Sequence, residues 1–395
     1  MREISTTMRI PKKTLKALTY PYNIRSLRNS EAQGTVTIRN NCTCTKCCLM
    51  RRKLGIPNDC MEEYSVSLND YANFMMNFDE GKFITCPNWT YTLHESASIQ
   101  SNEDLPEKNI KSYTVTQCHI MITLLNIVQQ VRSNGIIKEL DLDDIVAMTG
   151  YGIATIRRAL EVLRQTYLIE YKVMPYDSKL IDVMIIGYDN CYKKDGDGYL
   201  VITGYEYQLL SQLRHTMSYH ICLIGLEQTD ITGDITVYAS TIRSRFKKYV
   251  RAYQIDNAIW AGEDADIIRE FLSPSRQEEI SKDTSKKNKH LRSFKRVIFT
   301  FSRLMTKQNR KQFIEDLVEQ TYQKLLHIAL NEFNLTEELI EKLSKQLKKV
   351  AQNARNFSED LVVETFRLFG QNPKIDNIAN YIQGVLSKGY HEAWE

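Results

Sequence analysis

The sequence predicts a mainly α-helical protein with small β wings, in the α+β class. Amphipathic helical patterns recur from about residue 113 to the C-terminus, and pairs of short strand-like runs interrupt them. Residues 1–105 differ, because they hold six of the nine cysteines and no long helical pattern. Since a single core rarely grows beyond roughly 250–300 residues, the 395-residue chain should contain several domains.

Composition and charge limit the classes of protein to consider. The chain is 43% hydrophobic and 25% charged, which is typical of a globular protein. A net charge of +4 is too small to indicate nucleic-acid or membrane binding by itself, so local clusters of charge must decide. No stretch approaches the roughly 20 apolar residues of a membrane span, and the N-terminus has no apolar core of a secretory signal. We therefore expect a cytoplasmic protein without a membrane partner.

Residues 1–105 are predicted to form a small cysteine-rich domain. Cys44 and Cys47 have the Cys-x-x-Cys spacing that directs two thiolates at one tetrahedral ion, and Cys60 and Cys86 would complete a set of four. The substitutes for these ligands are Cys42, Cys48 and His94. Because a second close pair of cysteines is missing, a structural zinc ion and a set of buried free thiols both stay open.

Residues 110–190 are predicted to form a winged-helix DNA-binding domain. A helix runs from about Tyr113 to residue 134, and the stretch DLDDIVAMTGYGIATIRRAL at 141–160 then predicts a helix, a tight turn and a second helix. Asp141 would cap the first of these, and Gly150 would end it. The strand-like runs LIEYKVM and LIDVMIIGY follow, joined by a turn at residues 175–179. Three helices and a β-hairpin in this order are typical of a winged helix.

The rest of the chain divides into three further predicted parts. Residues 199–272 are interpreted as a second winged-helix-like module, which contains a strongly basic helix at 240–253. Residues 273–293 are rich in Ser and Lys and are predicted to be a flexible linker. Residues 294–395 are all helical by pattern and are predicted to bind a protein partner.

Two helices and one hairpin carry the predicted contacts to double-stranded DNA. In the first module the residues are Thr155, Arg157, Arg158 and Arg164 on the helix predicted at 153–167, with Tyr151 at its start and Lys172 and Lys179 on the wing. In the second module they are Arg243, Arg245, Lys247, Lys248 and Arg251. The alternative is that these cations only solvate helices that are structural or that contact protein.

Catalytic motifs are not evident in the sequence. It has no Gly-rich phosphate loop ending in Lys-Ser/Thr, no His-Glu-x-x-His and no Gly-x-Ser-x-Gly. Its histidines are scattered, so the metal-binding histidine pair of a nicking enzyme is missing as well. We predict that the protein is not an enzyme.

The order of the modules resembles that of bacterial plasmid and phage replication initiators, in which two winged helices grip repeated origin sequences. The run NPKIDNIANYIQGVL at residues 372–386 is similar to the last helix of DnaD-like primosome proteins. That resemblance implies a winged helix followed by a helical domain that binds DNA and helps to load the replicative helicase.

These patterns together lead to one functional expectation and two alternatives. We expect a sequence-specific DNA-binding protein that recognises a replication origin and recruits a helicase, a helicase loader or a polymerase through residues 294–395. The first alternative is a transcription regulator of a phage or mobile element, whose helical tail forms a homodimer or senses a ligand. The second is an accessory subunit of a polymerase or replisome whose winged helices dock on protein.

Overall fold

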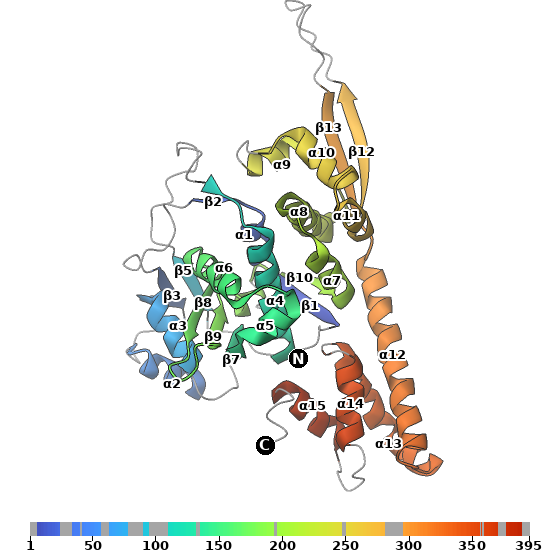
Figure 1. Ribbon diagram of the computed structural model, residues 1–395. Coiled ribbons are helices and arrows are strands. Elements are labelled where there is room, and N and C mark those ends of the chain that lie inside the picture. The colour runs from blue at the N-terminus through green and yellow to red at the C-terminus, as the bar shows by residue number, and fades with distance from the viewer. Residues whose placement is uncertain are drawn as a thin grey trace, which may run out of the picture.

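The structure is a computed structural model. It describes residues 6–23, 34–39, 42–56, 63–77, 90–94, 110–131, 135–192, 196–246, 250–280, 295–355, 357, 359–369 and 377–388. These residues are mainly helical with small antiparallel sheets, which confirms the predicted class (Figure 1). Within these ranges, no helix combines the length and the apolar composition that crossing a bilayer requires.

The first unit contains the helices and the hairpin predicted for residues 110–190. Its elements are α4 (Val115–Val131), β7 (Ile136–Asp141), α5 (Leu142–Thr149), α6 (Ile153–Gln165), β8 (Ile169–Val173), β9 (Leu180–Ile185) and the 3-10 turn η3 (Asp189–Tyr192). The three strands form an antiparallel sheet in the order β7-β9-β8. The sequence did not predict β7, because a bulge between Ile137 and Leu140 interrupts the alternation of its apolar side chains. Glu139 lies in this bulge with φ 48°.

A second unit repeats this order of elements. It consists of α8 (Thr216–Thr232), β11 (Asp234–Tyr238), α9 (Ala239–Arg245), α10 (Ala252–Trp260), α11 (Ala265–Phe271), β12 (Leu272–Ile280) and β13 (Lys295–Arg303). Its sheet has the order β11-β13-β12, so in both units the last strand lies between the other two. Helix α11 is the one addition. The β12–β13 hairpin projects from one end of the molecule (Figure 1).

The prediction of a flexible linker at residues 273–293 is wrong for residues 273–280, the part of this range that the structure describes. Residues 273–280 lie in β12, which pairs with β13 from Leu272 opposite Arg303 to Ile280 opposite Lys295. Residues 295–303 are therefore strand as well, although the sequence predicted helix from residue 294 onward. The sequence does not predict strand β12, because its side chains are mostly polar. The partner strand that hydrogen-bonds its backbone begins 15 residues after β12 ends.

The N-terminal residues join the two units and do not belong to the cysteine-rich part. The joining elements are β1 (Thr7–Pro11), α1 (Lys12–Leu18), β10 (Tyr199–Thr203) and α7 (Gly204–Gln212). Strand β1 pairs with β10, and Met8 and Leu15 are fully buried in one core that runs through both units. The pair β2 (Tyr22–Asn23) and β6 (Ile110–Lys111) closes the entry and exit of the intervening chain. The predicted domain at 1–105 is thus an insertion that starts after residue 23.

The described part of this insertion packs on the first unit. It comprises β3 (Thr35–Arg39), α2 (Thr45–Lys53), β4 (Glu63–Ser67), α3 (Leu68–Asn77) and β5 (Thr90–His94), with the sheet order β4-β3-β5. Its core includes Tyr71 and Met75 of α3, together with Ile136 and Met184 from the sheet of the first unit. The insertion therefore covers the face of that sheet opposite to α4.

The C-terminal helices form a separate core at the end of the molecule opposite to the hairpin (Figure 1). They are α12 (Lys307–Asn331), α13 (Glu337–Ala351), the 3-10 turn η4 (Gln352–Arg355), α14 (Glu359–Phe369) and α15 (Ile378–Lys388). The hydroxyls of Thr6 and Thr7 donate to the carbonyls of Phe357 and Arg355 at 2.7 and 2.6 Å, which ties this bundle to the N-terminal strand.

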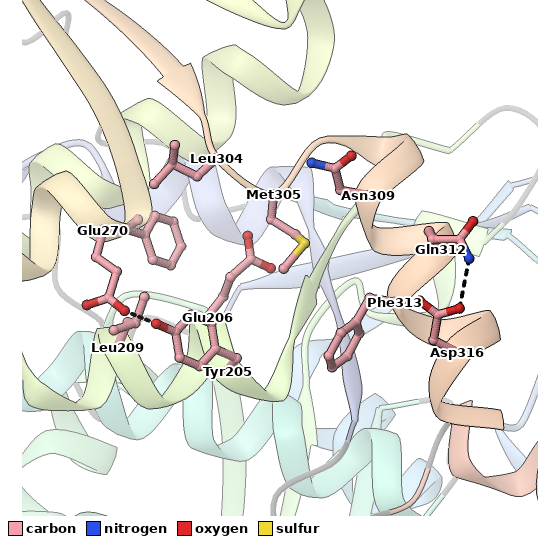
Figure 2. Close-up of a pocket in the computed structure, with 11 residues that line it drawn as sticks. Tyr205, Glu206, Leu209, Glu270, Leu304, Met305, Asn309, Gln312, Phe313 and Asp316 are labelled. Atoms are coloured by element: carbon pink, nitrogen blue, oxygen red, sulfur yellow. Dashed lines mark hydrogen bonds between the residues drawn. The ribbon is translucent and has the colours of Figure 1, made fainter. Parts of the chain in front are cut away.

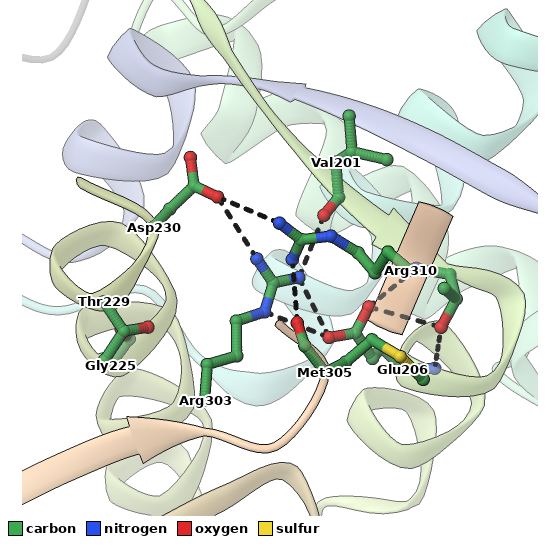
Figure 3. A network of polar contacts seen from close by, with 9 residues as sticks. Val201, Glu206, Gly225, Thr229, Asp230, Arg303, Met305 and Arg310 are labelled. Atoms are coloured by element: carbon green, nitrogen blue, oxygen red, sulfur yellow. Dashed lines mark hydrogen bonds and ion pairs between the residues drawn. The ribbon is translucent and has the colours of Figure 1, made fainter. Parts of the chain in front are cut away.

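A buried ionic network fixes α12 to the second unit (Figure 3). Arg303 of β13 donates to the Glu206 carboxylate at 2.9 Å and to the Val201 carbonyl at 2.9 Å, and lies 3.4 Å from Asp230 of α8. Arg310 of α12 reaches the same Asp230 oxygen at 3.4 Å. Burial lowers the pKa of Arg310, and the nearby charge of Arg303 adds to this effect. Two cations and two carboxylates balance, so the network carries no net charge.

Two histidines in the main core should make the protein sensitive to acid. His119 and His220 are both buried, and burial lowers the pKa of each to about 4. The unfolded chain therefore binds more protons than the native state between about pH 6.5 and pH 4, so stability falls as the pH is lowered through this window.

We expect the free energy of unfolding to drop by roughly 2 kcal/mol per histidine between pH 7.5 and pH 5. Urea denaturation at the two pH values measures this drop. A His119→Gln variant should lose about half of the difference. Equal stability of the wild type at both pH values would contradict this role of the histidines.

Candidate nucleic-acid interface

Helix α6 owes its position to the turn that precedes it. Asp141 caps α5 by accepting the Asp143 amide at 2.8 Å, as the sequence predicted. Gly150 ends α5 with φ 73°, a left-handed conformation that glycine adopts without strain. Helix α6 then packs Ile156, Leu160 and Leu163 against α4 and α5. Its opposite face is left to solvent.

That solvent face carries a hydroxyl and two guanidinium groups. Thr155, Arg157 and Arg158 are all exposed in the first two turns of α6. Arg157 Nη2 donates to the Ser178 carbonyl at 2.8 Å, which ties the helix to the turn of the β8–β9 hairpin. Arg158 makes no ion pair within the part of the chain that the structure describes. A free guanidinium in the second turn of such a helix can reach a guanine edge or a phosphate.

The β8–β9 hairpin offers fewer cations than the sequence indicated. Lys172 is exposed on β8, in agreement with a role at the surface. Lys179 pairs with Asp143 at 2.7 Å, and this carboxylate raises the pKa of its ammonium. Tyr176 donates its hydroxyl to Glu139, so a second carboxylate lies beside the turn. Lys179 would have to leave Asp143 before it could bind a phosphate.

Two further residues of the first unit that the sequence predicts to contact DNA, Arg164 and Tyr151, have partners within the protein. Arg164 donates to both oxygens of Glu161 at 3.0 and 2.8 Å, and the bond raises the pKa of Arg164. Tyr151 is half-buried, and its ring packs edge-on against His119 at 5.7 Å between centroids. Both side chains are only partly exposed, whereas Arg158 is exposed. The sequence gives the charge of Arg164 and the ring of Tyr151, but not that these groups contact Glu161 and His119.

The basic helix predicted at 240–253 is not continuous in the structure. Helix α9 ends at Arg245 and α10 begins at Ala252. Arg243 Nε donates to the Val250 carbonyl at 3.0 Å, and Arg245 pairs with Glu227 at 3.1 Å beneath the Tyr20 ring. These two arginines therefore hold the unit together. The predicted contacts Lys247 and Lys248 lie outside the described residues.

Helix α10 takes the place in the second unit that α6 has in the first, and the sequence did not single it out. Tyr253 and Asn257 are exposed on α10, while Ile255 and Ile259 are fully buried. Arg251 is exposed at the N-cap of this helix. The four-residue spacing of the two isoleucines is the signal that could have identified the helix. The neighbouring arginines hide this signal, because their spacing favours one continuous basic helix over 240–253.

Three cysteine thiols of the insertion lie close together. The Sγ atoms of Cys42, Cys44 and Cys47 are within 4.8 Å of one another, so these residues could hold a metal ion. Cys44 is the N-cap of α2, and its amide donates to Cys42 Sγ at 3.4 Å. The sequence predicts Cys42 only as a substitute ligand. The predicted ligands Cys60 and Cys86 lie outside the described residues.

The other cysteines have different surroundings. Cys48 Sγ lies 3.5 Å from the Thr43 carbonyl and 3.5 Å from Arg51, and it does not join the cluster of three. The thiols predicted to be core are buried, and burial raises the pKa of each; they are Cys118, Cys191 and Cys222.

A scan against known protein families finds no match for the chain, and a search of the curated proteins finds no relative.

Proposed function

We propose that the protein binds double-stranded DNA in a sequence-specific manner through two winged-helix modules. The observation that carries this proposal is the repeated order of elements, with the sheets β7-β9-β8 and β11-β13-β12. Helix α6 lies directly before the first hairpin, and its counterpart α10 is separated from the second hairpin by the additional helix α11. In a winged helix that helix enters the major groove, and the hairpin lies along the backbone. Helix α6 supports the proposal with an exposed hydroxyl and two arginines in its first two turns.

The second module contributes a different set of contacts in this proposal. Helix α10 presents Tyr253 and Asn257, and an asparagine amide can pair with both exposed groups of an adenine edge. Arg251 supplies a cation where the helix begins. Residues 281–294, which connect β12 to β13 in the sequence, contain five Lys or Arg residues and one Asp, a composition suited to phosphate contacts.

Within this proposal, we favour a replication initiator that recruits a helicase, helicase loader or polymerase through its C-terminal helices. The support is the tandem arrangement of two modules and a separate helical core attached to the second of them.

Selection of duplexes from a random pool by the full chain tests this proposal. Directly repeated sites favour the initiator, whereas an inverted repeat favours the transcription regulator. Recovery of no common sequence favours the protein-docking subunit.

We also propose that the insertion holds a structural zinc ion through Cys42, Cys44 and Cys47. The donor set fits, because tetrahedral Zn–S bonds of about 2.3 Å place sulfurs about 3.8 Å apart, within the span of the observed cluster. An N–H group pointing at Cys42 Sγ favours the thiolate form that binds metal. A fourth ligand from Cys60 or Cys86, as the sequence predicts, would complete the site.

Metal analysis of the purified full chain should find about one zinc per molecule. A Cys44→Ser variant should lose the metal, and because Cys44 is exposed the loss can be measured on folded protein. Cys48→Ser is the matched control, since it removes a neighbouring thiol outside the cluster and should keep the zinc. Absence of metal from the wild type, or equal loss from both variants, would contradict the proposed ligands.

A further inference from the structure

An apolar pocket lies where the second unit meets the C-terminal helices (Figure 2). It has a volume of about 400 Å³. Its walls come from α7, α11, the turn after β13 and the start of α12. The apolar side chains around it are Tyr205, Leu209, Phe271, Leu304, Met305 and Phe313. Three of them are unusually exposed for their size, with Tyr205 at 45%, Leu304 at 49% and Phe313 at 39%. A cluster of large apolar groups in water is typical of an interaction site.

The charges at the rim of this pocket are all negative. Glu270 and Asp316 are exposed there, and the third carboxylate, Glu206, is neutralised by Arg303. Glu270 accepts a hydrogen bond from Tyr205, and Asp316 accepts one from the Gln312 amide at 2.8 Å (Figure 2). Both donors are uncharged. Among the residues that the structure describes, neither Glu270 nor Asp316 meets a cation.

The pocket is built into a rigid part of the molecule. Glu206, Arg303 and Arg310 belong to α7, β13 and α12, and their buried network holds three walls of the pocket in place. A preformed site requires little reorganisation on binding, so more of its contact energy appears as affinity. The two rim carboxylates would repel phosphates, which makes DNA an unsuitable occupant.

We propose that this pocket binds a short segment of a partner protein that carries one large apolar side chain flanked by lysine or arginine. The apolar anchor would fill the space between Leu304, Met305 and Phe313, and a flanking cation would pair with Glu270 or Asp316. The volume of about 400 Å³ falls within the range of known small-ligand pockets, so the pocket can accommodate one large side chain. This inference goes beyond DNA binding and does not depend on it.

Panning a random dodecapeptide library on the full chain tests the inference. Enriched peptides should share an aromatic residue or leucine next to Lys or Arg. Their dissociation constants should rise about tenfold or more in Phe313→Ser and Leu304→Ser, since both remove anchor contacts at a hot spot. Leu339→Ser is the matched control, because Leu339 is as exposed as Phe313 but lies on α13, away from the pocket. It should leave binding unchanged.

The charge of the rim is tested separately with the Glu270→Gln and Asp316→Asn double variant. Peptide binding by the wild type should weaken as salt is raised, and the double variant should lose most of this dependence. Enrichment of acidic peptides, of no common motif, or of peptides that bind the pocket variants as well as the wild type would overturn the proposal. A dimer of the chain that Phe313→Ser dissociates would also overturn it, because the occupant would then be a second copy. None of these outcomes changes the expected binding of duplex DNA.

Discussion

Replacing Arg303 by methionine is expected to lower the free energy of unfolding by about 3–5 kcal/mol. The side chain of Arg303 is 4% exposed and donates to Glu206, to Asp230 and to the Val201 carbonyl. Its removal leaves the Glu206 carboxylate buried without its main cation. Glu206 also caps α7 by accepting the Thr203 amide at 2.7 Å, so it cannot turn away to solvent without freeing that amide. Urea denaturation of wild type and variant measures the loss.

Arg276→Met is the matched control for this prediction. Arg276 lies on the strand paired with β13 and forms an ion pair with Asp256 at 3.4 Å, but its side chain is 43% exposed. Its replacement should cost less than about 1 kcal/mol. A double variant that adds Glu206→Gln to Arg303→Met should recover part of the loss, because it removes the unpaired charge. If Arg303→Met were no more harmful than Arg276→Met, the network would not be the link that holds α12 to the second unit.

Replacing Arg158 by alanine is expected to weaken binding to the selected DNA site by roughly 5- to 150-fold, which corresponds to about 1–3 kcal/mol. Arg158 is exposed, and no described carboxylate holds it, so its guanidinium is available to a base edge. Arg157→Ala should weaken binding as well, and it should also loosen the hairpin because it removes the bond to the Ser178 carbonyl. Fluorescence anisotropy with the selected duplex and with a shuffled duplex separates the two effects.

Arg164→Ala is the control on the same helix. It removes the same charge, but Arg164 is only partly exposed and is held by both oxygens of Glu161. We expect its DNA affinity to stay within about threefold of the wild type. Equal losses from Arg158→Ala and Arg164→Ala would mean that only the net charge of the helix matters, in contradiction to a base contact by Arg158.

The elements of the first unit were largely predictable because their signals are local. Asp141 and Gly150 mark the two ends of α5 through capping and a left-handed turn, and both effects depend on a few neighbouring residues. The spacing of Ile156, Leu160 and Leu163 likewise defined the buried face of α6. The second hairpin was not predictable in this way, because β12 is polar and pairs with a strand beyond residue 294.

The roles of individual cations depended on contacts that the sequence does not show. Arg245 looked like a phosphate contact, but it pairs with Glu227, which lies 18 residues earlier on α8. Arg158 and Arg164 each lie three residues from Glu161, and only the structure shows that the Glu161 carboxylate pairs with Arg164. The cysteine cluster shows the same limit, since the sequence predicts Cys60 as a ligand ahead of Cys42, whose sulfur lies close to those of Cys44 and Cys47.

The most direct test of DNA binding is the dissociation constant of the full chain for a selected duplex and for a shuffled duplex of the same composition, measured over a series of salt concentrations. We predict at least about 10³-fold tighter binding to the selected duplex near physiological salt, and an affinity for both duplexes that falls steeply as salt is raised. Failure to enrich any duplex, or equal affinity for the selected and shuffled sequences, would contradict recognition of DNA by these two modules.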